Sequence, residues 1–359
     1  MKNLAQILVT FGFIIMTILM NACSVLQNMD LGTNTKVEND DQESKKGCPK
    51  KYCPNSRDKL AKLLKSEDVY LSDIDTSKIT DMSFLFGNFI DKNGESFCTK
   101  GYLSKKQKDK CENSASHRKN FSGLESWDTS KVKDMAYMFY NQTLFNEDIS
   151  SWNVANVRNM AYMFFGAKVF NQPLNRWNVA NVKDMKFMFA NTESFNQPLE
   201  NWNVRNVKDM AGVFMVAKSF NQNIESWNVD KVQNMAYMFS HTEVFNQPLN
   251  QWSVRNVKDM QSLFANAKAF NQPLNRWNVV NVKDMANMFF GAKVFNQNIS
   301  SWNVANVRNM AYMFMSAESF NQNIQSWNVN KAQNMSWMFE YSPLRYYPPK
   351  WYAPWKNKR

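Results

Sequence analysis

The sequence is poor in the residues on which most enzymes depend. It has 2 histidines and 10 glycines in 359 residues, and neither His117 nor His241 stands beside a nucleophile or in a metal-binding motif. Catalysis by a Ser-His-Asp or Cys-His arrangement requires a histidine with such partners. The sequence also has no glycine-rich phosphate loop. We therefore expect a protein that is not an enzyme and that needs neither a cofactor nor a metal ion.

The charge and the hydropathy of the chain restrict its class further. Hydrophobic residues make up 44% of the sequence and charged residues 21%, which is enough apolar surface for a core and excludes a wholly disordered chain. The mean hydropathy of −0.53 excludes a membrane protein with many spans. The formal net charge of +12 favours acidic partners such as phosphates, acidic glycans or anionic lipid.

The N-terminus has the pattern of an export signal. Lys2 precedes an apolar run from Leu4 to Met20, and Asn-Ala-Cys follows, ending at Cys23. This order predicts a signal peptide over residues 1–22, and its end resembles the bacterial lipoprotein box, in which the cysteine is lipidated. The alternative is an uncleaved transmembrane anchor, although the run is short for a span of about 20 residues. We expect lipidation at Cys23, with export and attachment to the membrane.

Residues 23–47 are polar and predict a flexible tether between the anchor and the rest of the chain. Four cysteines follow, Cys48, Cys53, Cys98 and Cys111, and an even number in an exported chain suggests disulfides. Three connectivities are open, including closure of Cys48 on Cys53 and of Cys98 on Cys111. The rival interpretation is a zinc site of all four thiolates, although structural zinc prefers more closely spaced pairs.

Aromatic residues and methionines reveal a repeat. The chain has 12 Trp, 23 Met and 27 Phe, and one tryptophan recurs at a constant step of 25 residues. A fixed period of this length predicts stacked supersecondary units, a solenoid, which we place at residues 121–341. The recurring tryptophans are Trp127, Trp152, Trp177, Trp202, Trp227, Trp252, Trp277, Trp302 and Trp327.

Each unit predicts one short helix and one short strand. Apolar residues at i, i+3, i+4 and i+7 form a helical face, preceded by Asn or Asp as the N-cap. Alternation around the tryptophan predicts the strand. Strands stack at about 4.8 Å and helices at about 8–10 Å, so the stack should curve with its strands inside. The expected fold is an α/β solenoid that is leucine-rich-repeat-like. One helical face comprises Met160, Met163, Phe164 and Ala167, and the next strand Leu174, Trp177 and Val179.

Segments at both ends depart from the repeat and predict caps. Residues 48–120 contain a degenerate repeat at 71–86 and an insertion at 92–120 that carries two of the cysteines. Residues 342–359 are rich in aromatic and basic side chains. We expect this last segment to cover the final coil; the alternative is a patch that binds lipid or a partner.

The repeat resembles a known family. Segments 149–164 (ISSWNVANVRNMAYMF) and 170–172 (FNQ) are similar to a bacterial surface-protein repeat of about 26 residues, which is common in lipoproteins of mycoplasmas and similar to the leucine-rich repeats of BspA-like surface proteins. The resemblance covers residues 55–345, although this chain departs from the family in its strict 25-residue period. It implies adhesion or host interaction and brings no catalytic residues.

Positions that vary between units beside the tryptophan are the candidate ligand-binding residues. Arginine suits carboxylate, sulfate and phosphate groups, and the predicted strands would place these side chains on the inner surface. The candidates are Arg176, Glu200, Arg205, Glu225, Arg255 and Arg276. A second row is mostly basic and is expected on the outer face, with part of its charge cancelled by the Asp or Asn that follows each member. Its members are Lys133, Arg158, Lys183, Lys208, Lys258, Lys283 and Arg308, with Gln233 as the exception.

These observations predict a non-catalytic binding module, exposed at the cell surface as a lipoprotein. Its expected partners are a host or envelope protein or an acidic glycan, besides the bacterial membrane that holds its lipid anchor. We do not expect nucleic acid, because export places the chain outside the cytoplasm. The alternative is a scaffold lipoprotein that faces the periplasm and contacts other envelope proteins.

Overall fold

The computed structural model describes residues 48–91, 93–99, 101 and 103–355. The expected signal peptide, Cys23 and the tether lie outside the described residues. No helix in the described part of the chain is long and apolar enough to cross a membrane. The elements, where η marks a 3-10 helix, are α2 (Arg57–Leu64), η2 (Leu71–Asp73), η3 (Phe97–Thr99), α3 (Lys105–Glu112), η4 (Leu124–Ser126), η5 (Pro343–Arg345) and η6 (Lys350–Trp355).

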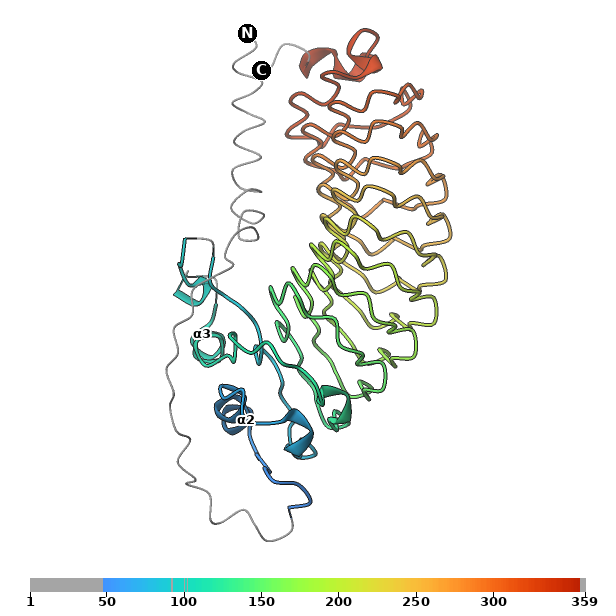
Figure 1. The fold of residues 1–359 in the computed structure, drawn as a ribbon. Coiled ribbons are helices and arrows are strands. Elements are labelled where there is room, and N and C mark those ends of the chain that lie inside the picture. The colour runs from blue at the N-terminus through green and yellow to red at the C-terminus, as the bar shows by residue number, and fades with distance from the viewer. Residues whose placement is uncertain (1–47, 92, 100, 102, 356–359) are drawn as a thin grey trace.

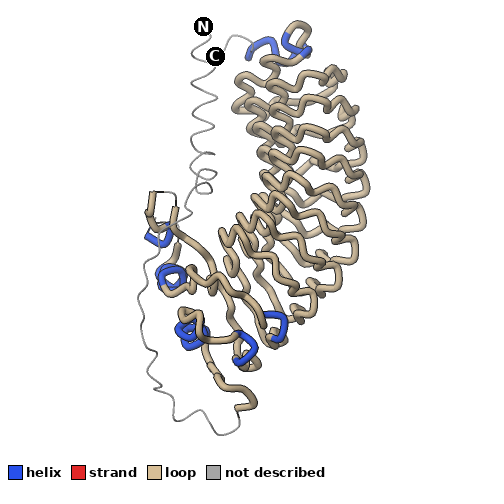
Figure 2. Tube along the Cα trace, in the orientation of Figure 1, coloured by secondary structure: helices blue, strands red, loops and turns tan. Residues whose placement is uncertain are grey.

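Stacked coils form a curved column between η4 and η5 (Figures 1 and 2). Over residues 127–342 the chain consists of turns, extended links and isolated parallel bridges between equivalent residues of successive coils. The prediction of stacked units with a 25-residue period is therefore confirmed. The predicted helix and strand within each unit are wrong, because these residues form neither a helix nor a multi-residue strand.

The segment expected to be helical is instead a run of overlapping turns. The N–H of Met163 donates to the carbonyl of Met160 at 3.2 Å, and the third residue of this turn, Tyr162, has a φ of 59°, as a type II turn requires. A second turn follows directly, with a φ of 70° at Gly166. Successive four-residue turns direct apolar side chains inward at the same spacing as a helix. The apolar periodicity of the sequence therefore comes from these turns.

Hydrogen bonds between coils hold these turns together. The N–H groups of Met160, Tyr162 and Phe164 donate to carbonyls of the next coil at 2.9–3.0 Å, and equivalent positions do the same along the stack. All these donors point toward the C-terminal end. We call the surface formed by these segments the ladder face; in this coil it comprises residues 158–166.

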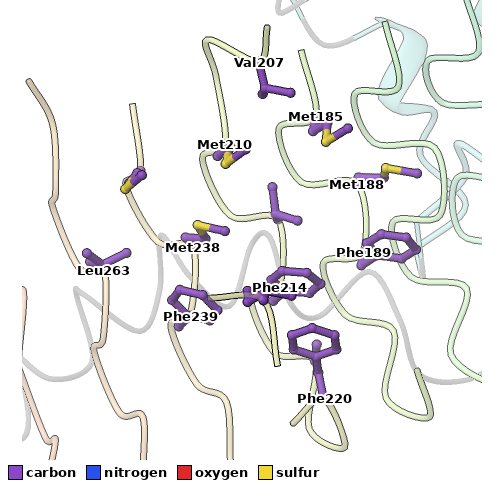
Figure 3. Packing of buried hydrophobic residues seen from close by; sticks show 14 of the residues in the cluster. Met185, Met188, Phe189, Val207, Met210, Phe214, Phe220, Met238, Phe239 and Leu263 are labelled. Carbon is purple, nitrogen blue, oxygen red and sulfur yellow. The ribbon is translucent and has the colours of Figure 1, made fainter. Parts of the chain in front are cut away.

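Buried columns of Phe, Met and Trp fill the interior. Phe189, Phe214 and Phe239 follow one another in successive coils, with methionines beside them (Figure 3), and all three are fully buried. On the far side of the coil each indole N–H donates to a Leu or Ile carbonyl of the preceding coil, as Trp227 does to Leu199 at 3.0 Å. Each coil therefore completes its core only against its neighbours.

The distances between equivalent rings show how the stack bends. On the ladder face the ring centroids of Tyr137 and Tyr162 are 4.6 Å apart. On the tryptophan side those of Trp202 and Trp227 are 6.2 Å apart. The coils are closest at the ladder face, which is therefore the concave side, and the tryptophan side is convex. The expectation that the tryptophan side lies inside the curve is wrong.

Buried arginines fix the N-terminal region around α2. Arg118 is 4% exposed and donates to the carbonyls of Ser66 and Val69 at 2.8 and 2.6 Å. Arg57 donates to the carbonyl of Ser83 at 3.0 Å. These bonds join α2, the degenerate repeat and the end of the insertion into one packed unit.

The four cysteines form two local pairs. Their Cα atoms are 5.9 Å apart for Cys48 and Cys53 and 5.6 Å apart for Cys98 and Cys111, within the range that a disulfide needs. This is one of the three open connectivities, and it leaves no thiolate among the four for a zinc site. The second pair packs against the ladder face in a cluster that includes Phe84.

The C-terminal segment extends the tryptophan column by one ring. The indole N–H of Trp351 donates to the carbonyl of Ile324 at 3.0 Å, and its ring stacks on Trp327 with centroids 6.3 Å apart. Trp351 thus covers the last coil as another coil would. Tyr346 and Tyr347 of the same segment are 73% and 87% exposed.

Candidate binding surfaces

The six candidates beside the tryptophans lie on the convex side, in three separate rows. Arg205 and Arg255 share one row but are two coils apart. Arg276 donates to Gln251 of the preceding coil at 3.2 Å. Arg255 and Arg276 stand on opposite sides of the tryptophan position, so the structure does not bring them together around one ligand. Glu225 is half-buried, and the exposed members are Arg176, Glu200, Arg205, Arg255 and Arg276.

The second row, by contrast, lies on the concave ladder face. Each backbone N–H donates to the equivalent carbonyl of the preceding coil, as Lys183 does to Arg158 at 2.9 Å and Lys208 to Lys183 at 2.8 Å. These bonds keep the row in register, and seven coils each contribute one exposed cation. Within the described residues no ion pair involves the row, so the expected charge cancellation by direct pairing is not found. The basic row comprises Lys133, Arg158, Lys183, Lys208, Lys258, Lys283 and Arg308, interrupted at Gln233.

A column of aspartates and asparagines runs beside the basic row. Its side chains do not cap helices as predicted; Oδ1 accepts the backbone N–H two residues later, as Asp184 does from Lys186 at 3.0 Å. Burial, and then repulsion from neighbouring carboxylates, raises the pKa of Asp134, Asp184 and Asp259. No more than two carboxylates are adjacent, because the column reads Asp81, Asp134, Asn159, Asp184, Asp209, Asn234, Asp259, Asp284, Asn309 and Asn334.

An aromatic column also lines the ladder face and was not predicted from the sequence. The rings of Tyr137 and Tyr162 stack at 4.6 Å and those of Tyr162 and Phe187 at 5.0 Å. The column stops at Gly212, where an added Cβ would lie 2.3 Å from the Phe187 ring. Burial raises the pKa of both tyrosines, so their hydroxyls remain neutral. The sequence does contain a sign of this surface, because the residue type at this position of the repeat varies between coils, among Tyr, Phe, Gly, Ser, Asn and Trp.

His241 is held by hydrogen bonds at both ring nitrogens. Nδ1 lies 2.9 Å from Ser240 Oγ, and Nε2 lies 2.9 Å from Asn266 Nδ2. An amide nitrogen only donates, so Nε2 accepts and Nδ1 carries the hydrogen. Burial, and then the charge of Lys268, lowers the pKa of His241 to about 4. The neutral ring therefore links two coils and has no free nitrogen for a ligand.

Comparison with known proteins identifies a family. Its model, described as "Mycoplasma protein of unknown function, DUF285", matches residues 109–218, 197–295 and 272–345. These ranges overlap and cover 109–345 without a break, which is more than half of the chain and includes nearly all of the coils. No curated protein and no solved structure matches the chain. The chain therefore belongs to the DUF285 family of mycoplasma proteins of unknown function.

Proposed function

We propose that this protein is a non-catalytic binding module that binds acidic glycans on its concave face and is displayed at the cell surface through lipidated Cys23. The basic row carries the proposal of the ligand, because it presents exposed cations in register and without ionic partners among the described residues. The lipoprotein box and the resemblance to mycoplasma surface lipoproteins support the display and a role in adhesion.

The spacing of the basic row suits an extended polyanion. Rings in the adjacent aromatic column are 4.6–5.0 Å apart, so the basic row brings exposed cations of neighbouring coils close enough to repel one another. A ligand with negative groups along its length relieves this repulsion in several coils together, whereas a single small anion relieves it in one place. Binding of this kind weakens as salt rises.

The test removes four charges from the basic row in the full-length protein held in detergent. Lys183, Lys208, Lys258 and Lys283 are changed together to Gln, the residue that Gln233 supplies naturally in this row. Binding to heparin and hyaluronate is measured by calorimetry at two salt concentrations. We expect at least about a tenfold loss of affinity, from about 0.5 kcal/mol for each exposed charge.

The matched control removes the same number of charges from the convex side. It changes Arg176, Arg205, Arg255 and Arg276 together to Ser and should leave the affinity within about twofold. An equal loss in both variants would show that only net charge matters. A loss in the control alone would place the ligand beside the tryptophans and overturn the proposal.

A further inference from the structure

A polar groove lies on the tryptophan side near the C-terminal end of the stack. Every side chain that lines it is an amide or a hydroxyl, although the protein carries a net charge of +12. Its volume is about 390 Å³, within the range of small-molecule sites. The lining residues are Asn298, Ser300, Gln322, Asn323, Gln325 and Ser326.

The groove forms where two coils without a proline adjoin. Asn298 and Asn323 occupy a position that holds proline in four other coils, and the further asparagine at this position, Asn223, stands between two proline coils. Ser300 and Ser326 are also small where other coils carry Glu or Arg. No long side chain from the positions of Ser300 and Ser326 therefore covers the groove. The prolines in question are Pro173, Pro198, Pro248 and Pro273.

Hydrogen bonds orient the lining amides and leave donors for a ligand. Oδ1 of Asn298 accepts the N–H of Ser300 at 2.9 Å, and Oδ1 of Asn323 accepts the N–H of Gln325 at 3.0 Å. Oε1 of Gln325 accepts the N–H of Lys350 at 3.0 Å. The amide nitrogens of all three side chains have no hydrogen-bond acceptor in the described part of the chain. Because the amides are already oriented, binding costs less side-chain entropy.

The groove also contains hydrogen-bond acceptors that a ligand can use. Nε2 of Gln322 donates to the carbonyl of Asn296 at 2.9 Å, which leaves Oε1 for a ligand. Oγ of Ser326 donates to the carbonyl of Ser300 at 3.1 Å and keeps its lone pairs. The groove thus offers oriented donors and acceptors side by side and no charge.

We infer that this groove is a binding site for a neutral sugar. Each sugar hydroxyl both donates and accepts, and therefore matches the mixed amide and hydroxyl lining, whereas a charged ligand would find no counter-charge among the lining residues. The lining residues Asn323 and Gln325 flank Ile324, whose carbonyl accepts the indole N–H of Trp351 at 3.0 Å, so the C-terminal segment holds this wall of the groove in place. The site uses no residue of the basic row and is independent of the proposed function.

The test removes the amides of two lining asparagines by introducing the proline that other coils carry at this position. The double variant Asn298→Pro/Asn323→Pro loses no hydrogen bond of these two backbone N–H groups, since neither N–H is bonded to a described residue. Maltotriose, lactose and chitotriose are titrated into the full-length protein in a detergent without sugar headgroups, and binding is followed by saturation-transfer NMR. We expect the wild type to bind at least one of them, with Kd of about 1 mM or below, and the double variant to bind at least tenfold more weakly.

Asn223→Pro is the matched control, because it makes the same change in a coil outside the groove, and it should bind as the wild type does. Ser300→Glu, which introduces the residue found at Glu200 and Glu225, should abolish binding. The inference is overturned if none of the three sugars binds the wild type, or if the double variant or Ser300→Glu binds like the wild type. It is also overturned if Asn223→Pro loses as much affinity as the double variant.

Discussion

The asparagines in the aspartate column are predicted to limit charge repulsion along the ladder face. The change that tests this is Asn159→Asp, which joins the pair Asp81 and Asp134 to the pair Asp184 and Asp209. The result is an uninterrupted row of five half-buried carboxylates. An amide and a carboxylate accept the backbone N–H equally well at this position, so the substitution alters charge while it keeps the turn.

The expected cost follows from the spacing of the coils. Equivalent residues in bridged segments are about 4.8 Å apart, and two carboxylates at about 5 Å repel by about 1 kcal/mol in water and about 3 kcal/mol in a half-buried site. The substitution adds two such neighbours, and it also removes the hydrogen bond of the Asn159 side chain with Asp134. We expect the free energy of unfolding at pH 7 to fall by about 3–5 kcal/mol.

Urea unfolding at pH 7 and pH 4 measures this cost and its origin. A carboxyl group whose pKa is raised by folding takes up its proton in the folded state first, so stability relative to the wild type should recover as the pH falls through the raised folded-state pKa. The reverse change Asp184→Asn should stabilise the protein at pH 7. The control is Asn334→Asp, at an exposed site in the last coil beside Asn309, and should cost less than about 0.5 kcal/mol. If Asn159→Asp left stability unchanged at pH 7, or lost as much at pH 4, the electrostatic explanation would be refuted.

Three further predictions concern the core, a buried histidine and the anchor. Trp227→Ala should lower the free energy of unfolding by about 3–5 kcal/mol, with hydrogen exchange rising mainly in the adjacent coils; a uniform rise along the chain would contradict a stack of coils. His241 has its pKa lowered to about 4, so the unfolded chain binds its proton first and stability should fall by up to about 3 kcal/mol between pH 6.5 and 4. His241→Asn, which copies Asn266 one coil later, should remove that part of the pH dependence in thermal melts. Identical pH profiles for the wild type and His241→Asn would show that His241 does not cause this pH dependence. Cys23→Ser should abolish labelling with a clickable fatty acid, whereas equal labelling would show that Cys23 is not lipidated.

The buried columns could be predicted because stacking makes them identical in every coil. A coil whose Trp227 or Phe214 sits against the same residue above and below accepts little variation in volume, so these positions stay constant and the period is visible in one sequence. The local conformation could not be predicted in the same way. Overlapping turns and a two-turn helix both bury residues at i, i+3 and i+4, and the apolar pattern does not separate them.

Positive φ angles distinguish overlapping turns from a helix, but few of these positions hold a glycine that would reveal them in the sequence. The two left-handed positions of each coil hold side chains such as Tyr162 and Asn191, which single residues adopt at a cost of about 1–2 kcal/mol. Only Gly166, Gly212 and Gly291 mark them within the coils. The concave and convex faces were assigned the wrong way round for the same reason. A strand in the tryptophan segment would have placed its flanking residues on the concave face.

The directional bonds between coils also explain how the stack begins. Because the N–H groups of the ladder-face turns donate to the next coil, the equivalent carbonyls of the first coil have no preceding coil from which to accept a hydrogen bond. The carbonyl of Ser83 accepts from the guanidinium of Arg57 at 3.0 Å, and that of Leu85 accepts from the N–H of Ala115 at 2.7 Å. The N-terminal cap therefore supplies a cation and donors where the stack presents acceptors.

The last coil presents the opposite groups. The N–H groups of Met335 and Phe339 point where another coil would follow and find no acceptor among the described residues, while the rings of Trp351 and Tyr352 cover the apolar columns beside them. One end is thus closed by hydrogen-bond donors and the other by aromatic packing. Neither closure depends on the coils between them, because the backbone hydrogen bonds and the buried Phe and Trp columns recur from coil to coil. We therefore expect that 25-residue units away from the two caps can be added or removed without disturbing either cap, and that such a change alters the length of the basic row.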